Sequence, residues 1–410
     1  MEIRPLLSAL WRSRTGPLLV AVQVAIALTV LVNVAYMIEQ RIELARRPTG
    51  IDLENIFWIG SQGYTSDYNQ GTAVAADLTW LNALPGVVAA AAIHAVPQTY
   101  NTTSLPFAPG PLANESAGEN SLLYMTTARG IDALGLKLIA GRTPLPETVR
   151  PPAADMMESF TRWAPEIVIT RNLADKIFPK GDALGKTLYA GIVNKPAKIV
   201  GIVEHMQGLP ISGPWGEVTE RAVFLPGIPP GQNANYLVRT QPGRRAAVMA
   251  QVEKELPDRE PGRYIARMQA LDEAAAQTRT WMRASAIILG VVGLLVLAVT
   301  AIGIFGLAAF NVAIRTKQIG TRRALGARKF HILRYFLVEN WLVTTSGAII
   351  GCVLALALGV ELSKMFQMAR LPLYYILAGV VGLWIIGLAA VLFPARRAAA
   401  IAPATATRTV

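Results

Sequence analysis

Residues 284–314 read ASAIILGVVGLLVLAVTAIGIFGLAAFNVAI, and no charged residue lies between Arg283 and Arg315. A helix needs about 20 apolar residues to cross the hydrocarbon core of a bilayer. Three more uncharged stretches of comparable character lie at 16–36, 342–360 and 371–394. The sequence therefore predicts four membrane-spanning helices. The first is expected to remain uncleaved, because its apolar run is longer than that of a signal peptide and no small-residue cleavage site follows it.

The composition of the whole chain agrees with a membrane protein. Hydrophobic residues make up 52% of the 410 residues, and charged residues make up only 16%. An average soluble domain carries about 25% charged residues. The low charge therefore indicates that a large part of the chain lies in lipid.

The placement of Lys and Arg predicts how the helices are oriented. These residues gather before the first helix, between the second and third, and after the fourth: Arg4, Arg12, Arg14; Arg315, Lys317, Arg322, Arg323, Arg328, Lys329, Arg334; Arg396, Arg397, Arg408. Short flanks rich in Lys and Arg stay in the cytoplasm. We therefore expect both termini and residues 315–334 to be cytoplasmic, and residues 38–283 to lie outside.

The net charge of +12 follows from the same distribution. Residues 38–283 contain equal numbers of basic and acidic residues, so the whole excess lies in the membrane segments and their flanks. Such an excess indicates topology and contact with anionic lipid. It does not predict a nucleic-acid partner, which would need a basic face on a folded domain.

These observations predict the order of the parts along the chain. The predicted parts are a cytoplasmic helix at 1–15, transmembrane helices at 16–37, 284–314, 335–360 and 371–395, an extracytoplasmic domain at 38–283, a cytoplasmic loop at 315–334, a short outer loop at 361–370 and a cytoplasmic tail at 396–410. The fold class is a membrane protein with four transmembrane α-helices and a large α+β extracytoplasmic domain between the first and second helices.

The extracytoplasmic domain shows alternating strand and helix patterns. Strands are predicted at 54–60, 122–128, 166–170, 197–205, 221–226 and 235–240, helices at 73–83, 171–178 and 243–256, and loops at 61–72 and 96–120. The second loop is rich in Pro, Asn and Gly and holds sequons at Asn101 and Asn114 that are short enough to occur by chance. Residues 268–283 and 39–47 are expected to extend the neighbouring membrane helices outward as a pair of stalks.

No catalytic or metal-binding pattern is found in this domain. It shows no paired carboxylates, no nucleophile with a base and no ligand cluster, so we expect no catalytic site on this chain. Cys352 is the single cysteine, and the three histidines are far apart in sequence, which argues against a metal site.

Residues 181–187, GDALGKT, look like a phosphate-binding loop. That loop needs four residues between its first Gly and the Gly-Lys-Ser/Thr, because this length lets backbone N–H groups surround the phosphates. Only three residues separate Gly181 from Gly185, and Lys186 is expected outside the cytoplasm. We therefore interpret the stretch as a structural turn.

The cytoplasmic loop contains TRRALGA, a short basic segment bracketed by Gly320 and Gly326. Two interpretations are open on the residues alone. The segment is an ordinary positive-inside loop, or it lies along the membrane surface and presents a small apolar face, with Ala324, Leu325 and Ala327, to another protein.

The stretch RTKQIGTRRALGARKFHILRYFLVE at 315–339 resembles the cytoplasmic loop of the MacB/FtsX-like permeases of ABC transporters. The residues that carry the resemblance are Ile319, Gly320, Arg322 or Arg323, Ala324, Leu325, Gly326, Ala327 and Glu339. Gln318 departs from the family pattern, which often has Glu at this position. Three other stretches also resemble the family: LLSALWRSRTGPLLVAVQVAIAL, ITRNLADKIFPKGDALGKTL and FPARRAAAIAPATATR.

The resemblance implies a function and a set of partners. It implies a dimer of permeases, identical or related, above a cytoplasmic dimer of ABC ATPases. ATP and Mg²⁺ would bind to the ATPase, and no cofactor is expected on this chain. Residues 319, 320 and 322–327 would couple the two proteins and pass ATP-driven motion through the stalks to the outer domain, a process called mechanotransmission. Because few residues precede the first helix, the ATPase is expected to be a separate polypeptide.

Several activities are compatible with this resemblance. The first is efflux of peptides, toxins or antibiotics with a periplasmic adaptor and an outer-membrane channel. The second is lipoprotein release, and the third is a signalling permease that controls a cell-wall hydrolase without transport. An enzymatic outer domain is the least favoured. The size of the outer domain favours the first two, and the sequence does not specify the substrate.

Glu339 is an acidic residue close to the start of the third helix. A carboxylate in the centre of a bilayer costs roughly 2.5–3.5 kcal/mol on insertion scales. We expect it at the interface, paired with Arg315 or Arg334 and stabilising the helix end, or as a contact within the coupling region.

Overall fold

The computed structural model describes residues 15–99, 102–112, 118–155, 157–158, 163–191, 193–208, 218–366 and 371–401. The chain forms two compact units, one from Met1–Ile42 and Ala284–Val410 and the other from Glu43–Arg283. Residues 1–14 of the predicted first helix, the sequon asparagines Asn101 and Asn114, most of the tail at 396–410 and part of the outer loop at 361–370 lie outside the described residues.

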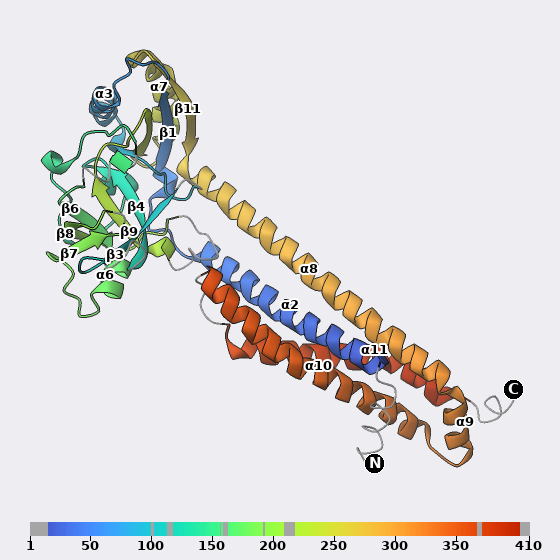
Figure 1. Ribbon diagram of the computed structural model, residues 1–410. Helices are drawn as coiled ribbons and strands as arrows, with labels where there is room; N and C mark the ends of the chain where they lie inside the picture. Colours follow the sequence, from blue (N-terminus) through green and yellow to red (C-terminus); the bar gives the residue numbers. More distant parts are fainter. Residues whose placement is uncertain are drawn as a thin grey trace. The chain divides into compact units, whose positions relative to one another are not determined.

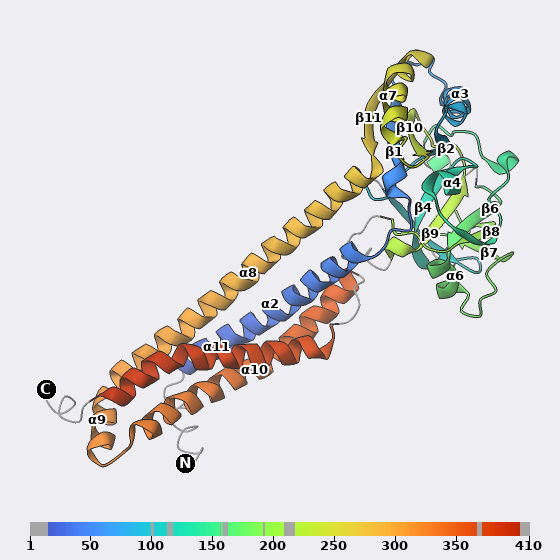
Figure 2. The same cartoon turned by 180° about the vertical axis from the view of Figure 1, so that it is seen from behind.

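The first unit is built from helices. Its long helices are α2 (Thr15–Arg46), α8 (Leu271–Ile314), α10 (Lys329–Phe366) and α11 (Leu373–Ala400), and the short α9 (Thr316–Ala324) lies between α8 and α10. The last residues of α2, from Glu43, and the first residues of α8, up to Arg283, belong to the second unit. All four long helices are apolar and long enough to cross a membrane. Their membrane portions lie side by side in both views (Figure 1, Figure 2). Most of the helix limits differ from those of the predicted spans, whose limits stay predictions.

Helix α2 is the most enclosed of the four, because the other three all pack against it. Its membrane window is 44% buried, against 17–33% for the others. Glycines of the partner helices allow this close approach, as is common between helices in membranes. A Cβ at Gly347 of α10 would lie 2.5 Å from the Ala21 carbonyl oxygen, and one at Gly379 of α11 would lie 2.6 Å from Val32. On the α8 side, Gln23 donates to the Val299 carbonyl at 2.9 Å.

The second unit contains a four-stranded antiparallel sheet with two helices on one face. Its elements are β1 (Ile56–Gly63), α3 (Gln70–Ala83), β2 (Val87–Ile93), β10 (Asn233–Thr240), α7 (Arg245–Glu255) and β11 (Arg263–Ala270). The strand order is β11-β1-β10-β2, and neighbouring strands are antiparallel. This order and the β-α-β-β-α-β sequence of elements define a ferredoxin-like sheet, with the remaining strands inserted between β2 and β10.

The inserted strands form a closed ring. They are β3 (Thr103–Ala108), β4 (Glu119–Thr126), β6 (Glu166–Thr170), β7 (Thr187–Ala190), β8 (Lys195–Val203) and β9 (Ala222–Pro226), with β5 (Leu138–Gly141) paired to β8. Pairing runs β4-β3-β7-β8-β6-β9 and returns from β9 to β4, so the ring leaves no free edge among these strands. The short helices α4 (Gly130–Leu134) and α6 (Arg171–Ile177) and 3-10 turns at Leu53–Asn55, Pro146–Thr148, Val218–Glu220 and Pro257–Arg259 complete the unit.

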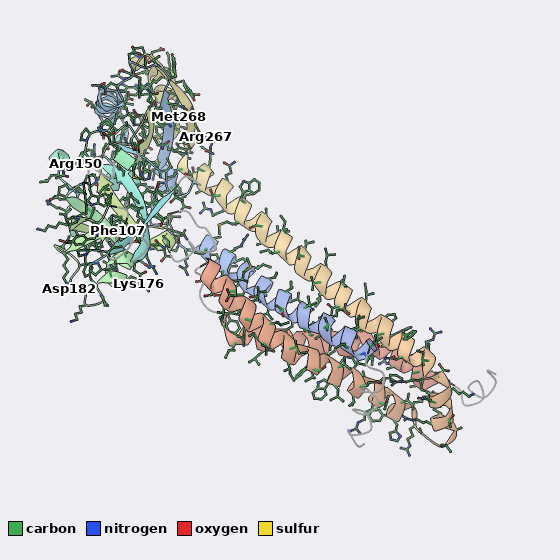
Figure 3. The ribbon with its side chains drawn as sticks, viewed as in Figure 1. Phe107, Arg150, Lys176, Asp182, Arg267 and Met268 are labelled. Carbon is green, nitrogen blue, oxygen red and sulfur yellow. The ribbon has the colours of Figure 1, made fainter. Side chains whose placement is uncertain are left out.

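Alternating side chains divide the interior of this unit into three layers. On β4, Leu123 and Met125 belong to the core inside the ring, together with Phe107 of β3 (Figure 3). Leu122 and Tyr124 face the other way, toward β2 and α4. A third cluster lies between the ferredoxin-like sheet and the helices α3 and α7. The two-residue period of each strand thus builds two cores at once.

A buried ion pair fastens helix α3 to the sheet. Arg263 of β11 donates to both carboxylate oxygens of Asp77 on α3, and one of these hydrogen bonds measures 3.0 Å. The Tyr236 hydroxyl donates to the same carboxylate at 2.6 Å. The Arg263 and Asp77 side chains are 0% and 1% exposed. Burial and the neighbouring carboxylate raise the pKa of Tyr236 well above its ordinary value.

Two predicted loops and the start of one predicted helix are wrong in detail. The predicted loop at 96–120 contains strand β3, whose alternating Leu105 and Phe107 enter the ring core in spite of the surrounding Pro and Gly residues. The predicted loop at 61–72 contains the end of β1 and the start of α3. Residues 268–270 belong to β11, and helix α8 begins only at Leu271. In each case pairing with a distant strand determines the conformation, which local composition does not reveal.

Candidate functional site

The predicted cytoplasmic loop at 315–334 contains the short helix α9. The helix begins directly after Arg315 and ends at Ala324. The chain then reverses through a Schellman-type cap, in which Ala327 N–H donates to the Arg322 carbonyl and Gly326 N–H to the Arg323 carbonyl, both at 3.1 Å. Gly326 has a φ of +94°, a conformation that residues with a Cβ rarely adopt. The conformation of this turn therefore explains why a glycine stands at position 326.

The inner face of α9 is fixed to the helical unit. Ile319 is 5% exposed and packs in one apolar cluster with Ile332, Phe336 and Ala398. The neighbouring Gly320 is also buried. Ile319 and Gly320 are thus both buried, and their part in coupling stays a prediction.

An ion pair connects the start of α9 to helix α10. Arg315 Nη1 donates to both carboxylate oxygens of Glu339 at 2.9 Å, and also to the Tyr335 hydroxyl at 3.3 Å. The Arg315 and Glu339 side chains are 19% and 9% exposed. Of the two partners expected for Glu339, the structure selects Arg315. Breaking such a pair leaves an uncompensated charge, so the pair holds α9 in its position.

Two arginines of α9 make further contacts with neighbouring helices. The Arg322 guanidinium lies over the Tyr335 ring, 5.3 Å from its centre. Arg323 donates to the Ile401 carbonyl at 2.5 Å, beyond the end of α11. Both residues were predicted as coupling residues, and both also position α9 within its own chain.

The tip that follows α9 faces outward. Leu325 is 84% exposed, and a Cβ at Gly326 would meet no atom within 4 Å. Ala324 is exposed as well, while Ala327 is partly buried against the helical core. Phe330, at the start of α10, is 64% exposed. Sequence reasoning missed Phe330, although a large apolar residue within a basic segment is the signal that would have identified it.

The GDALGKT stretch forms a turn that leads into strand β7. Lys186 Nζ pairs with Asp182 at 2.5 Å and lies 5.0 Å from the centre of the Phe178 ring. Gly181 and Gly185 both have positive φ values, +76° and +82°. The lysine is therefore engaged by its own loop, and the glycines serve the turn. Figure 3 labels Asp182 at the periphery of this unit.

Two family models match the chain. The MacB-like periplasmic core domain matches residues 18–255, which is more than half of the chain. The FtsX-like permease C-terminal model matches residues 290–403, including α9 and Glu339. Together they cover both units.

Curated relatives show the same similarity. The probable syringafactin export ATP-binding/permease protein SyfD of Pseudomonas syringae is 29% identical over 59% of this chain and 38% of its own length. The macrolide export ATP-binding/permease protein MacB of Wolinella succinogenes is 30% identical over 61% of this chain and 39% of its own length. The chain thus spans about two fifths of the length of these relatives.

Among solved structures, the periplasmic region of MacB from Actinobacillus actinomycetemcomitans aligns with 56% of this chain and 94% of its own, at 14% identity and a TM-score of 0.33. The two family matches are the decisive finding, since between them they span the sheet unit, the long helices and α9. The chain belongs to the MacB/FtsX-like permease family.

Proposed function

We propose that this chain is the permease subunit of an ABC transporter that works by mechanotransmission. An ATPase on the cytoplasmic side would bind at the tip of α9, and its closure would move the long helices and with them the outer unit. ATP and Mg²⁺ would be bound by that ATPase. The observation that carries the proposal is the construction of α9, which is held firmly on its inner face and is exposed at its tip.

The division of α9 into two faces fits a coupling element. Ile319, Gly320 and the Arg315–Glu339 pair tie the inner face to the helical unit, so a force on α9 is passed to the helices. Leu325, Gly326 and Ala324 are left exposed, and Arg322 lies beside them. A small apolar tip with a basic rim suits a groove in a partner, because a packed apolar centre supplies most of the affinity.

Helix α8 offers a route for the motion. It is a single helix of 44 residues from Leu271 to Ile314, ending one residue before Arg315. It begins directly after strand β11, so the same helix leaves the sheet of the outer unit and leads to α9. Along it, α2 runs antiparallel, with Gly16 against Leu307 and Arg41 hydrogen-bonded to Ser285. The outward ends of these two helices, residues 39–46 and 271–283, are the proposed stalks.

The proposed setting is a bacterial inner membrane, with both termini inside and the outer unit in the periplasm. A second permease chain, identical or related, would complete the dimer. The names of the relatives favour export of peptides, toxins or antibiotics, since SyfD and MacB are described as exporters of syringafactin and of macrolides. A periplasmic adaptor and an outer-membrane channel belong to this proposal.

Photo-crosslinking tests the proposed docking point. A photoreactive amino acid at Leu325 is expected to crosslink to the cognate ATPase in membranes. The same group at Leu295, an exposed residue within α8, is the control and should crosslink to lipid or to another permease chain. Absence of an ATPase adduct at Leu325, with ATPase present in the same membranes, would refute docking at this tip.

A further inference from the structure

The outer unit contains a groove that the coupling account does not use. It has a volume of about 400 Å³ and lies where β1, β10 and β11 meet the loops around His94 and Pro229. Ligand sites commonly have volumes of about 300–1,000 Å³ and combine an apolar wall with a few polar groups. The Trp58 side chain and two prolines, Pro229 and Pro230, provide the apolar wall here.

An irregularity in the sheet shapes this groove. The β1–β11 register shifts between Gly60 and Ser61, where Gly60 pairs with Arg267 and Ser61 pairs with Ile265. Ala266 is therefore the extra residue of a bulge. In a regular strand, neighbouring side chains point to opposite faces, but here both Ala266 and Arg267 line the groove. Bulges of this kind often redirect a side chain at a functional site.

The charge of the groove is one-sided. Arg267 lines it and is exposed, with its guanidinium 5.9 Å from the centre of the Trp58 ring (residue 267 is labelled in Figure 3). No Asp or Glu is among the described residues that line the groove, and no ion pair of Arg267 is found within the described chain. An anionic group would therefore meet a cation without a competing carboxylate.

The other polar groups of the groove are held in place by the fold. The Asn235 amide donates to the His94 carbonyl at 2.9 Å. His94 Nδ1 accepts from the Met125 N–H at 2.9 Å, which leaves Nε2 as the protonated nitrogen of the neutral ring, 3.3 Å from the Thr103 hydroxyl. Within the described chain, Trp58 Nε1 is enclosed without a hydrogen-bond partner. Because this nitrogen has essentially no exposed surface, Trp58 meets a ligand in the groove through its ring and not through its N–H.

We infer that this groove binds a carboxylate attached to an apolar or amide-containing body. The carboxylate would pair with Arg267, while the body would lie against Trp58 and the two prolines. This chemistry is shared by acylated amino acids and by the free carboxyl end of a peptide. The inference does not depend on the proposed ATP coupling, because the groove lies wholly within Glu43–Arg283 and its occupancy is measured without an ATPase.

Calorimetry on the full chain in lipid nanodiscs tests the inference with two matched pairs of probes. One pair is N-acetyl-leucine and its amide, and the other is acetyl-Ala-Ala-Leu and its C-terminal amide. We expect each carboxylate to bind at least about tenfold more tightly than its amide, as a charge-assisted hydrogen bond requires. If only the peptide binds, the natural ligand is a peptide end. If N-acetyl-leucine and acetyl-Ala-Ala-Leu bind equally tightly, the natural ligands include small acylated amino acids.

Variants locate the binding. Arg267→Ala should abolish the preference for the carboxylate, while Arg267→Lys should retain part of it. Ala266→Phe should fill the groove and weaken all four probes. Arg171→Ala is the control, because Arg171 is an exposed arginine of α6 outside the groove. The inference is overturned if no probe binds saturably below about 1 mM, if amides bind as well as acids, or if Arg267→Ala leaves the preference unchanged.

Discussion

Among the described residues, two well-enclosed arginine–carboxylate pairs can be compared, one in each unit. Asp77–Arg263 in the outer unit is almost fully enclosed and has a tyrosine as a third partner. Arg315–Glu339 in the helical unit keeps 19% and 9% exposure and lies at the start of α9. The first joins a helix to a sheet inside a rigid core. The second holds α9, whose tip at Leu325 is exposed, so under the proposed coupling its strength would bear on function as well as on stability.

The largest effect is expected at the enclosed pair. Asp77→Ala would leave Arg263 charged and without its partner in the core, which typically costs about 3–5 kcal/mol. We expect the outer unit to unfold at a markedly lower denaturant concentration. Hydrogen exchange of the backbone amides of β10 and β11, measured in the full chain, reports this unfolding. Tyr236→Phe removes one hydrogen bond and keeps the ion pair, so it should cost about 1 kcal/mol. Equal effects of the two variants would show that the ion pair is not the important contact.

His94 is expected to make the folding stability of the outer unit depend on pH, which the two ion pairs are not expected to do. Burial lowers the pKa of His94 to about 4, from an ordinary value of 6.5. On acidification the unfolded chain takes up this proton first, so stability is lost as the pH falls from about 6.5 to 4. One pKa unit corresponds to about 1.4 kcal/mol, which gives a loss on the order of 2–3 kcal/mol.

Denaturant unfolding of the full chain at several pH values measures this dependence. His94→Gln should be less stable at neutral pH, because it loses the hydrogen bond from Met125, but its stability should change less between pH 6.5 and 4. A variant with the same pH dependence as the original chain would assign the effect to other groups.

The pair at α9 is expected to give a smaller effect on folding and a visible effect on coupling. Glu339→Gln keeps the shape and removes the charge. Groups in one network usually couple by about 0.5–3 kcal/mol. A double-mutant cycle of Glu339→Gln with Arg315→Gln should give a coupling energy in this range, smaller than that of the Asp77–Arg263 pair. We also expect less ATPase to co-purify with Glu339→Gln than with the original chain. If Glu339→Gln assembles and transports like the original chain, the pair only stabilises the helix end.

The two units also differ in how far the sequence predicts them. Uncharged runs give the four long helices directly, because lipid imposes length and composition on a helix. The ring of six strands is different. Strand β3 lies in a stretch rich in Pro and Asn, and its place depends on partners in β4 and in β7, far along the chain. Such long-range pairing leaves little trace in local composition.

The candidate site was predictable as a segment but not as a surface. The spacing of Gly320, Gly326 and the arginines marks residues 315–334 as unusual. It does not reveal that Ile319 is buried or that Phe330 is exposed, because the direction of each side chain depends on where α10 and α11 pack against α9. For Glu339 the sequence left two partners open, and only the fold brings Arg315 within 2.9 Å.

The most direct test of the account compares bulk with charge at the tip of α9. Ala324→Trp is measured against Ala324→Ser and Arg322→Ala for co-purification with the cognate ATPase and for stimulated ATP hydrolysis. Filling a packed contact typically costs about 1–3 kcal/mol, whereas an exposed charge usually contributes less than about 1 kcal/mol. The account predicts that Ala324→Trp inserts and folds but loses the ATPase, while both other variants keep it. Wild-type ATPase binding and hydrolysis in Ala324→Trp would contradict the assignment of this tip as the coupling element.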